Sequence, residues 1–330
     1  MQISVIGAGS WGTVLAQILN DNGHEVLLWA RSKAKAAAIE ATHCNADYLP
    51  QLKLDHAIHI TNDLTLAVNQ SQILVFVVPS KAMAETAERI SQINSCADKI
   101  LLSCTKGFDP ASKATMSSVL GRYLPQAKGL AVMSGPNLAG ELALRQPGAT
   151  VIASKEETTA EILQSLFLNN YFRPYTSSDL VGVELCGTLK NCMALVGGMI
   201  CGLEYGDNCL AALITRGLAE IKRLGLALGA EEATFNGLAG MGDLIATCMS
   251  TRSRNHLAGE ALARGKTLEE IQNTSKMVIE GIHTTKVAYN LGKEKNIELP
   301  IIEQLYAVLF TQKDVIAGLN CLMQREGKKE

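Results

Sequence analysis

The feature that most constrains the fold is a regular alternation of short β-rich runs with helical segments in the first half of the chain. Amphipathic helical patterns such as WGTVLAQILNDNG lie between most of the β-rich runs. This alternation predicts a doubly wound, mostly parallel sheet, and continuous apolar runs such as VFVV are typical of strands buried on both faces. The predicted strands are residues 2–7, 24–30, 57–61, 72–78, 99–104, 130–135 and 149–154.

The pattern changes near Asp179, where the strand signals end. The motif TSSD at residues 176–179 is a helix-start signal, and long helical runs over residues 181–203 and 209–228 follow it. A chain of 330 residues is long enough for two domains. The sequence therefore predicts an α/β domain over residues 1–180 and an all-helical domain over residues 181–330.

Composition excludes several classes of protein. The net charge of −2 gives no basic footprint for nucleic acid or for a lipid surface. Nine cysteines without a C-x-x-C pair favour reduced, buried thiols, and His56 and His59 lack the further ligands of a metal site. The start of the chain lacks a signal-peptide pattern, and the apolar run 191–203 is shorter than the roughly 20 residues of a membrane span. We expect a cytoplasmic protein without a metal.

A glycine-rich loop follows the first predicted strand. Gly7, Gly9 and Gly12 have the spacing G-x-G-x-x-G, directly after a strand and at the start of an amphipathic helix. In that context the first glycine permits a tight turn, the second lets the backbone approach a pyrophosphate, and the third lets helix and strand pack closely. The phosphates then meet free N–H groups at a helix start. The first domain is therefore predicted to be Rossmann-like and to bind a dinucleotide.

The end of the second predicted strand bears on which dinucleotide is bound. An NAD site usually has Asp or Glu there, whereas this chain has Ala30 and Arg31. An arginine can pair with the 2′-phosphate of NADP, although a solvated arginine at a strand end is the alternative. The predicted cofactor is NAD(P).

Polar residues follow two further predicted strands and recur in the helical half. Lys106 in SCTKGFD and the segment SGPNLAGE, with Gly135, Asn137 and Ala139, lie where ligands gather in open α/β sheets. In the helical half, GLAGMGDLIATC contains Asp243, and STRSRN contains Arg252, Ser253, Arg254 and Asn255. Arginine and serine suit a phosphate or a carboxylate. A loop lysine and a polar helix start are the plainer alternatives.

Lys190 is the one charged residue in a glycine-rich apolar stretch between Glu184 and Glu204. Burying an ammonium group is costly unless something compensates, so this lysine is either a functional group or a helix lysine whose amine reaches solvent.

Taken together, these segments resemble the bacterial NAD(P)-dependent sn-glycerol-3-phosphate dehydrogenases. The motifs that carry the resemblance are GAGSWGT, TKG, SGPNLAGE, GTLKN, GMGDLIATC, SRN and VIEG, in that order along essentially the whole chain. The resemblance implies that Lys190 is the proton acceptor. It implies substrate contacts at Lys106, Gly135, Asn137, Asp243, Ser253, Arg254 and Asn255. It implies cofactor contacts at Ser10, Trp11, Arg31, Lys106, Ala139, Arg254, Val278 and Glu280, beside the loop glycines.

The family reaction interconverts glycerol 3-phosphate and dihydroxyacetone phosphate, with a role in phospholipid synthesis. A free lysine has a pKa near 10.4, so we expect burial and the nearby cations Lys106 and Arg254 to lower the pKa of Lys190. Asp243 opposes that shift, and we therefore assign it to orienting Lys190 or a substrate hydroxyl. Two positions depart from the family pattern. This chain has Asn137 where the family has Ser or Thr, and Gly140 where a lysine is common.

Two other readings remain open from the sequence. One is a hydroxy-acid dehydrogenase with the same layout, and the other is a nucleotide sensor without catalysis. The sequence also leaves the oligomeric state open, with a homodimer as one possibility.

Overall fold

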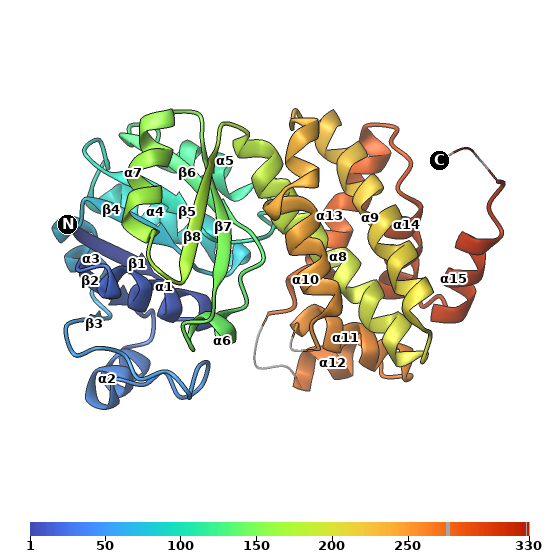
Figure 1. Ribbon diagram of the computed structural model, residues 1–330, viewed down its shortest axis with the longest axis horizontal. Coiled ribbons are helices and arrows are strands. Elements are labelled where there is room, and N and C mark those ends of the chain that lie inside the picture. Colours follow the sequence, from blue (N-terminus) through green and yellow to red (C-terminus); the bar gives the residue numbers. More distant parts are fainter. Residues whose placement is uncertain (252, 275–277, 328, 330) are drawn as a thin grey trace. The chain divides into compact units, whose positions relative to one another are not determined.

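The computed structural model describes residues 1–251, 253–274, 278–327 and 329 (Figure 1). The chain forms two compact units, Met1–Glu184 and Leu185–Glu330, where we predicted a boundary after residue 180. The first unit contains β1 (Gln2–Ile6), α1 (Ser10–Asp21), β2 (Glu25–Trp29), α2 (Lys33–Thr42), β3 (His59–Thr61), α3 (Leu64–Gln70), β4 (Ile73–Phe76), η1 (Ser80–Ala82), α4 (Met83–Ile93), β5 (Ile100–Ser103), α5 (Met116–Tyr123), β6 (Gly129–Ser134), α6 (Ala139–Leu142), β7 (Gly148–Ser154), α7 (Glu157–Phe167) and β8 (Phe172–Ser177).

The sheet of the first unit has the strand order β3-β2-β1-β4-β5-β6-β7-β8. All neighbouring strands pair in parallel except β6 and β7, which are antiparallel. The predicted doubly wound, mostly parallel sheet is therefore confirmed. The order reverses between β1 and β4, and such switch points are where open α/β sheets bind ligands.

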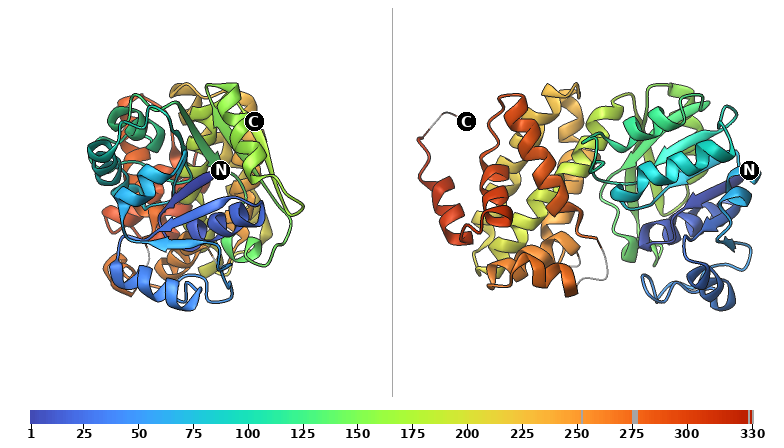
Figure 2. Two further views of the ribbon diagram at one scale, coloured as in Figure 1. Left: turned by 90° about the vertical axis from the view of Figure 1, so that its left-hand side faces the viewer. Right: turned by 180° about the vertical axis from the view of Figure 1, so that it is seen from behind.

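Helices cover both faces of this sheet (Figure 2). Along β4, Ile73 and Val75 belong to one apolar cluster with α1 and α7, while Leu74 and Phe76 belong to another with α3, α4 and α5. Because successive side chains of a strand point to opposite faces, β4 is buried on both sides, as the run VFVV predicts.

The strand β8 was missed in the sequence. Its segment FRPYTS contains Pro174, and its exposed residues Arg173 and Tyr175 alternate with buried Phe172 and Pro174. This pattern is typical of an edge strand, where one side lacks a neighbour and a proline is tolerated. We predicted no strand in this segment, and that interpretation was wrong.

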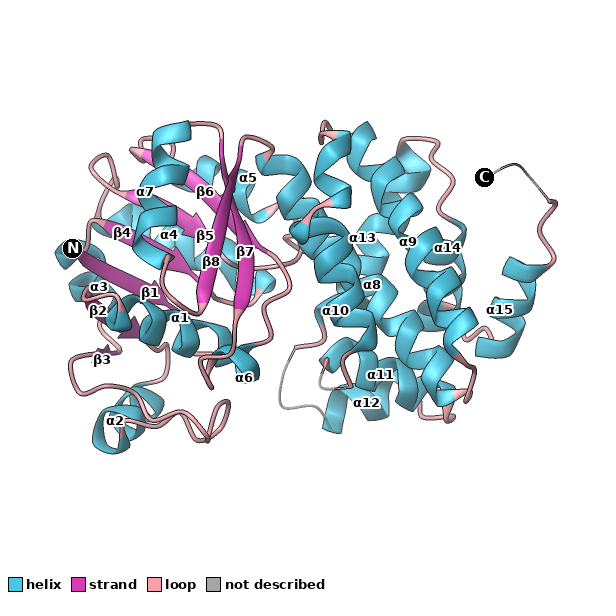
Figure 3. Cartoon of the chain, viewed as in Figure 1, coloured by secondary structure: helices cyan, strands magenta, loops and turns pink. Residues whose placement is uncertain are grey.

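In the described residues of the second unit every regular element is helical (Figure 3). The helix α8 (Leu180–Gly202) leads from the first unit into the second. The other elements are α9 (Asp207–Ala227), η2 (Glu232–Asn236), η3 (Leu238–Gly242), α10 (Asp243–Met249), α11 (Arg254–Ala263), α12 (Leu268–Thr274), α13 (Glu280–Glu294), α14 (Pro300–Phe310) and α15 (Val315–Met323).

Among the described residues, α8 alone is long and apolar enough to cross a membrane by length and composition. It has 23 residues, which is longer than the run of residues 191–203 that we judged too short. However, 89% of its most apolar 18-residue window is buried inside the protein. Core helices of globular proteins meet the same criterion, so α8 is weak evidence for a span.

Candidate active site

The glycine loop between β1 and α1 has the geometry that its spacing predicts. Gly7 has φ +127°, and a Cβ there would lie 2.7 Å from the Val77 carbonyl oxygen. A Cβ at Gly12 would lie 1.9 Å from the Gly7 carbonyl oxygen, whereas a Cβ at Gly9 would meet nothing within 4 Å. Gly7 and Gly12 are thus required by the turn itself, and Gly9 borders open space.

Gly9 is also the N-cap residue of α1, and no side chain caps this helix start. Uncapped N–H groups beside open space are what a dinucleotide pyrophosphate requires. The residues present therefore fit NAD(P).

The segment after α2 supports this loop from one side. Asn45 donates to the Ala8 carbonyl at 3.0 Å and to the Thr13 hydroxyl at 2.7 Å. The Ser10 hydroxyl donates to the Tyr48 carbonyl at 3.1 Å. Of the predicted nucleotide residues, Trp11 packs edge-on against Phe172, and Arg31 is exposed at the end of β2.

The ends of β5 and β6 bring together the residues predicted there. The Lys106 amine donates to the Gly135 carbonyl at 3.2 Å. The Asn137 side chain donates to the Ala149 carbonyl on β7 at 2.9 Å, which fixes the loop that leads to Ala139 at the start of α6. A Cβ at Gly135 would lie 2.9 Å from the Thr150 Cα, so only glycine fits between these strands.

Lys190 is buried in the second unit, and its side chain retains 9% of its exposed area. Its amine forms an ion pair with the Asp243 carboxylate, whose side chain retains 1%, and donates to the Thr247 hydroxyl at 2.7 Å. The Thr247 hydroxyl in turn donates to the Asp243 carbonyl at 2.6 Å. The amine is therefore held in one position by a buried counter-charge and a hydroxyl, as a group that transfers protons should be.

The start of α10 explains how Asp243 reaches Lys190. The glycine-rich segment LAGMG forms a single π-helical turn, η3, directly before α10. A Cβ at Gly240 would lie 2.2 Å from the Phe235 carbonyl oxygen, so the turn depends on a glycine there. Turns of this kind often occur at functional sites. Burial raises the pKa of the neighbouring Cys248 thiol to about 12, so this cysteine is a packing group and not a nucleophile.

A close crossing of α8 and α11 brings the SRN segment to the helix of Lys190. A Cβ at Gly198 would lie 1.9 Å from the His256 carbonyl oxygen, and a Cβ at Gly259 would lie 1.9 Å from that of Leu195. Glycines on both helices thus allow their backbones to touch.

Beside this crossing, the Asn255 amide donates to the Asn191 side-chain oxygen at 2.9 Å. The Asn255 oxygen accepts from the Gly281 N–H at 2.9 Å. Asn255 is buried, and it joins α8, α11 and the start of α13.

The remaining predicted residues lie at the starts of α11 and α13. The Ser253 hydroxyl caps α11 by accepting from the His256 N–H at 3.4 Å. The exposed Arg254 donates to the Val278 carbonyl at 2.9 Å, and Glu280 is the first residue of α13. Arg252 lies outside the described residues. The described part of the chain contains no group of three or more His, Cys, Asp or Glu side chains that could hold a metal ion.

Thr247 and Asn191 were missed in the sequence. Thr247 lies one helical turn after Asp243, so it shares a face with that residue, and this spacing was the available signal. Asn191 follows Lys190 directly, but its partner Asn255 is 64 residues away, and only the fold reveals that contact.

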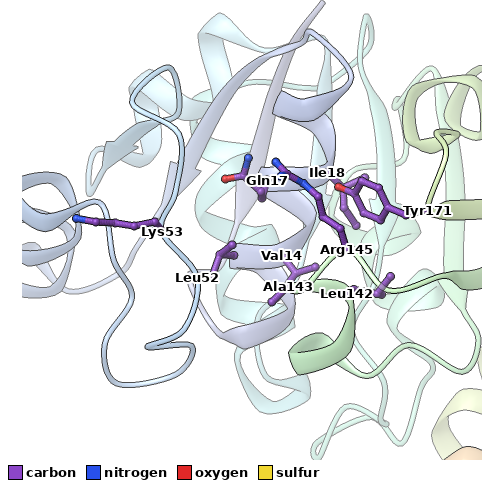
Figure 4. A pocket seen from close by; sticks show the side chains of 9 residues that line it. All are labelled: Val14, Gln17, Ile18, Leu52, Lys53, Leu142, Ala143, Arg145 and Tyr171. Carbon is purple, nitrogen blue, oxygen red and sulfur yellow. The ribbon is translucent and has the colours of Figure 1, made fainter.

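A separate small pocket is lined by residues of α1, of the segment around the end of α6 and by Tyr171 (Figure 4). Its polar groups already have partners in the protein. Arg145 and Tyr171 both donate to the Asp21 carboxylate, at 3.0 Å and 2.7 Å, and Gln17 donates to it at 2.8 Å. This network anchors the loop after α6 to α1, and we do not assign it to catalysis.

The first unit is thus a dinucleotide-binding domain, and the second carries a buried, oriented lysine. This combination defines a nicotinamide-dependent dehydrogenase.

Comparisons with known proteins identify the family. Residues 2–160 and 179–320 match the models of the N-terminal and C-terminal parts of NAD-dependent glycerol-3-phosphate dehydrogenase. A relative from Lactiplantibacillus plantarum, named glycerol-3-phosphate dehydrogenase (NAD(P)+), is 44% identical over 100% of this chain and 98% of its own. A crystal structure of glycerol-3-phosphate dehydrogenase from Coxiella burnetii is 34% identical, with a TM-score of 0.94 over 98% of this chain and 99% of its own. The chain belongs to the NAD-dependent glycerol-3-phosphate dehydrogenase family.

Proposed function

We propose that the protein interconverts dihydroxyacetone phosphate and sn-glycerol 3-phosphate, with NAD(P) as cofactor and Lys190 as the group that transfers the proton. The observation that carries the proposal is the buried amine of Lys190, held by Asp243 and Thr247 on a helix of the second unit. Family membership over both units supports the same reaction.

The cofactor, when bound, accepts a hydride from C2 of glycerol 3-phosphate or returns it to the carbonyl carbon of the ketone. The residues of the chain must therefore bind the substrate anion and move one proton at the C2 oxygen. Lys190 donates that proton during reduction and accepts it during oxidation. Because a carboxylate favours the charged form of a neighbouring amine, Asp243 stabilises the ammonium that oxidation produces.

The start of α11 is proposed to hold the substrate phosphate. Arg254 is exposed there, Ser253 supplies a hydroxyl, and the positive end of the helix dipole favours an anion. Asn255 bonds to Asn191 and Gly281, so we assign it to holding α11 in place. Its amide has a second N–H, which we propose for the contact with substrate. Remote binding of a phosphate fixes the reacting carbon and can lower the barrier by several kcal/mol, on the order given for positioning effects.

In the first unit we propose that substrate and cofactor are contacted by Lys106, Gly135, Asn137 and Ala139. The nucleotide is held there by Gly7, Gly9, Ser10, Trp11, Gly12 and Arg31. The second unit adds cofactor contacts at Arg254, Val278 and Glu280. The proposal includes a cytoplasmic location and the supply of glycerol 3-phosphate for phospholipid synthesis.

The experiment is a reduction assay with the purified chain that follows the loss of NADPH absorbance. We expect turnover with dihydroxyacetone phosphate and none with keto acids or semialdehydes of similar size. Turnover with a keto acid alone would favour a hydroxy-acid dehydrogenase. Cofactor binding without turnover of any of these substrates would favour a nucleotide sensor.

A further inference from the structure

A lysine that the motifs do not include lies against the glycine loop. Lys35, in the first turn of α2, donates from its amine to the carbonyl of Ala8, the residue between the first two glycines. The same amine lies 3.7 Å from the centre of the Tyr48 ring. The side chain therefore turns back from α2 onto the loop instead of extending into solvent.

This amine is partly desolvated and has no carboxylate at ion-pair distance among the described residues. Desolvation lowers the pKa of Lys35, and the more distant Asp47 opposes that effect. A carbonyl and an aromatic face hold a cation in place, but neither neutralises it. The Lys35 ammonium is therefore stabilised when an anion binds beside it.

The position of this amine matches one part of a dinucleotide. The Gly7 N–H donates to the Trp29 carbonyl at 3.0 Å, so the glycine loop lies beside the end of β2. In Rossmann-like domains the residues at this end contact the adenosine ribose at its 2′ position. Here that end carries Ala30 and the exposed Arg31 instead of an acidic residue.

Resting on the proposed dinucleotide-dependent function, we propose that Lys35 and Arg31 together bind the 2′-phosphate of NADP(H), so that Lys35 sets a preference for NADP(H) over NAD(H). Arg31 supplies an exposed guanidinium, and Lys35 supplies an amine already placed at the loop. A phosphate between them receives charge-assisted hydrogen bonds from two sides.

The competing role for Lys35 is support of the loop alone, through its bond to the Ala8 carbonyl. That role affects both cofactors equally, because both share the pyrophosphate and the loop. Lys35→Gln separates the two roles, since a glutamine amide can still donate to a carbonyl but carries no charge. Lys33→Ala is the matched control, because Lys33 is an exposed lysine two residues away on the same helix.

The test measures dissociation constants of the full chain for NADPH, NADH, 2′,5′-ADP and 5′-AMP by calorimetry. In Lys35→Gln we expect binding of NADPH and 2′,5′-ADP to weaken about tenfold, the loss typical of one charged hydrogen bond, with NADH and 5′-AMP unchanged within about twofold. Lys33→Ala should stay within about twofold for all four ligands. The NADPH advantage of the natural protein should also shrink as salt is raised.

Equal losses for NADPH and NADH in Lys35→Gln, or no loss for either, would overturn the assignment of Lys35. So would a natural protein that binds NADH as tightly as NADPH. These results leave the proposed reaction intact, because reduction of dihydroxyacetone phosphate with either cofactor is measured separately.

Discussion

At the scale of single residues, the site of Lys190 depends on what surrounds one buried amine. The sequence predicts its burial correctly, because every neighbour in its stretch is uncharged. The sequence also singles out Asp243, which does bond to Lys190. It could not select Thr247 as the third member, because a threonine in an apolar helix is ordinary until its partner is known.

The hydroxyl of Thr247 should matter for turnover. In Thr247→Val the side chain keeps its shape but no longer accepts from the Lys190 amine, so the amine loses one of its two described bonds. We expect kcat for dihydroxyacetone phosphate reduction to fall about 10- to 100-fold, the range for one charged hydrogen bond, while NADPH binding is unchanged. Steady-state kinetics with calorimetry measures both, and an unchanged kcat would remove Thr247 from the site.

Alanine substitutions at Gly9 and Gly12 should distinguish an effect on cofactor binding from an effect on stability. Gly9→Ala places its methyl group in open space, so thermal stability should be nearly unchanged while binding of NADPH and NADH weakens at least about tenfold. Gly12→Ala forces a methyl group into the Gly7 carbonyl and should lower stability as well. Thermal melts and binding titrations of both variants provide the check. Tight NADPH binding by Gly9→Ala would mean that the pyrophosphate lies elsewhere.

At the scale of elements, the helices and the buried strands follow from their patterns, whereas pairing at the edges does not. Predicted helices over residues 181–203 and 209–228 correspond to α8 and α9. The strand β8 was missed because its polar, proline-containing segment resembles a loop until β7 is known to lie beside it. The crossing of α8 and α11 could not be predicted from the sequence either, because glycines in a helix do not show which helix packs against them.

The substitution Gly259→Ala tests the close packing of α8 against α11. Gly259→Ala forces a methyl group into the Leu195 carbonyl, so we expect a loss of about 1–3 kcal/mol in the free energy of unfolding and a higher KM for the phosphorylated substrate. Gly318→Ala in α15 is the control, because the added methyl group makes only ordinary contact there, 3.5 Å from Val308. That control should gain up to about 1 kcal/mol from helix propensity. Equal effects of the two substitutions in denaturant titrations would argue against a tight crossing.

Glu220 links α9 to the start of α14 and should make stability depend on pH. Its carboxylate accepts from the Ile301 and Ile302 N–H groups at 2.7 and 3.2 Å, and burial raises its pKa from 4.5 to about 7. Because the folded state holds this proton more tightly than the unfolded state, the contribution of Glu220 to stability is greatest below pH 4.5 and falls as the pH rises through about 7.

Glu220→Gln should remove this part of the pH dependence. Between pH 5 and 8 the free energy of unfolding of the natural protein should fall by up to about 3 kcal/mol relative to the variant. Denaturant titrations of both proteins at several pH values provide the measurement, and parallel pH profiles would contradict the assigned pKa.

At the scale of the whole molecule, each unit has its own task. The first unit has the switch-point topology and the glycine loop of a dinucleotide-binding domain, and the second holds the amine and the candidate phosphate site. This division was predictable, because periodicity changes once, near Asp179, and each half carries its own motifs. Single contacts far apart in sequence, such as that between Asn191 and Asn255, were not predictable.

Chemical rescue of Lys190→Ala, with turnover measured as added primary amines are titrated, tests most directly whether Lys190 transfers the proton. Turnover should collapse while NADPH binding remains, and small ammonium ions should restore part of the rate in order of their acidity and size. A Lys190→Ala variant that keeps most of its turnover would show that another group transfers the proton.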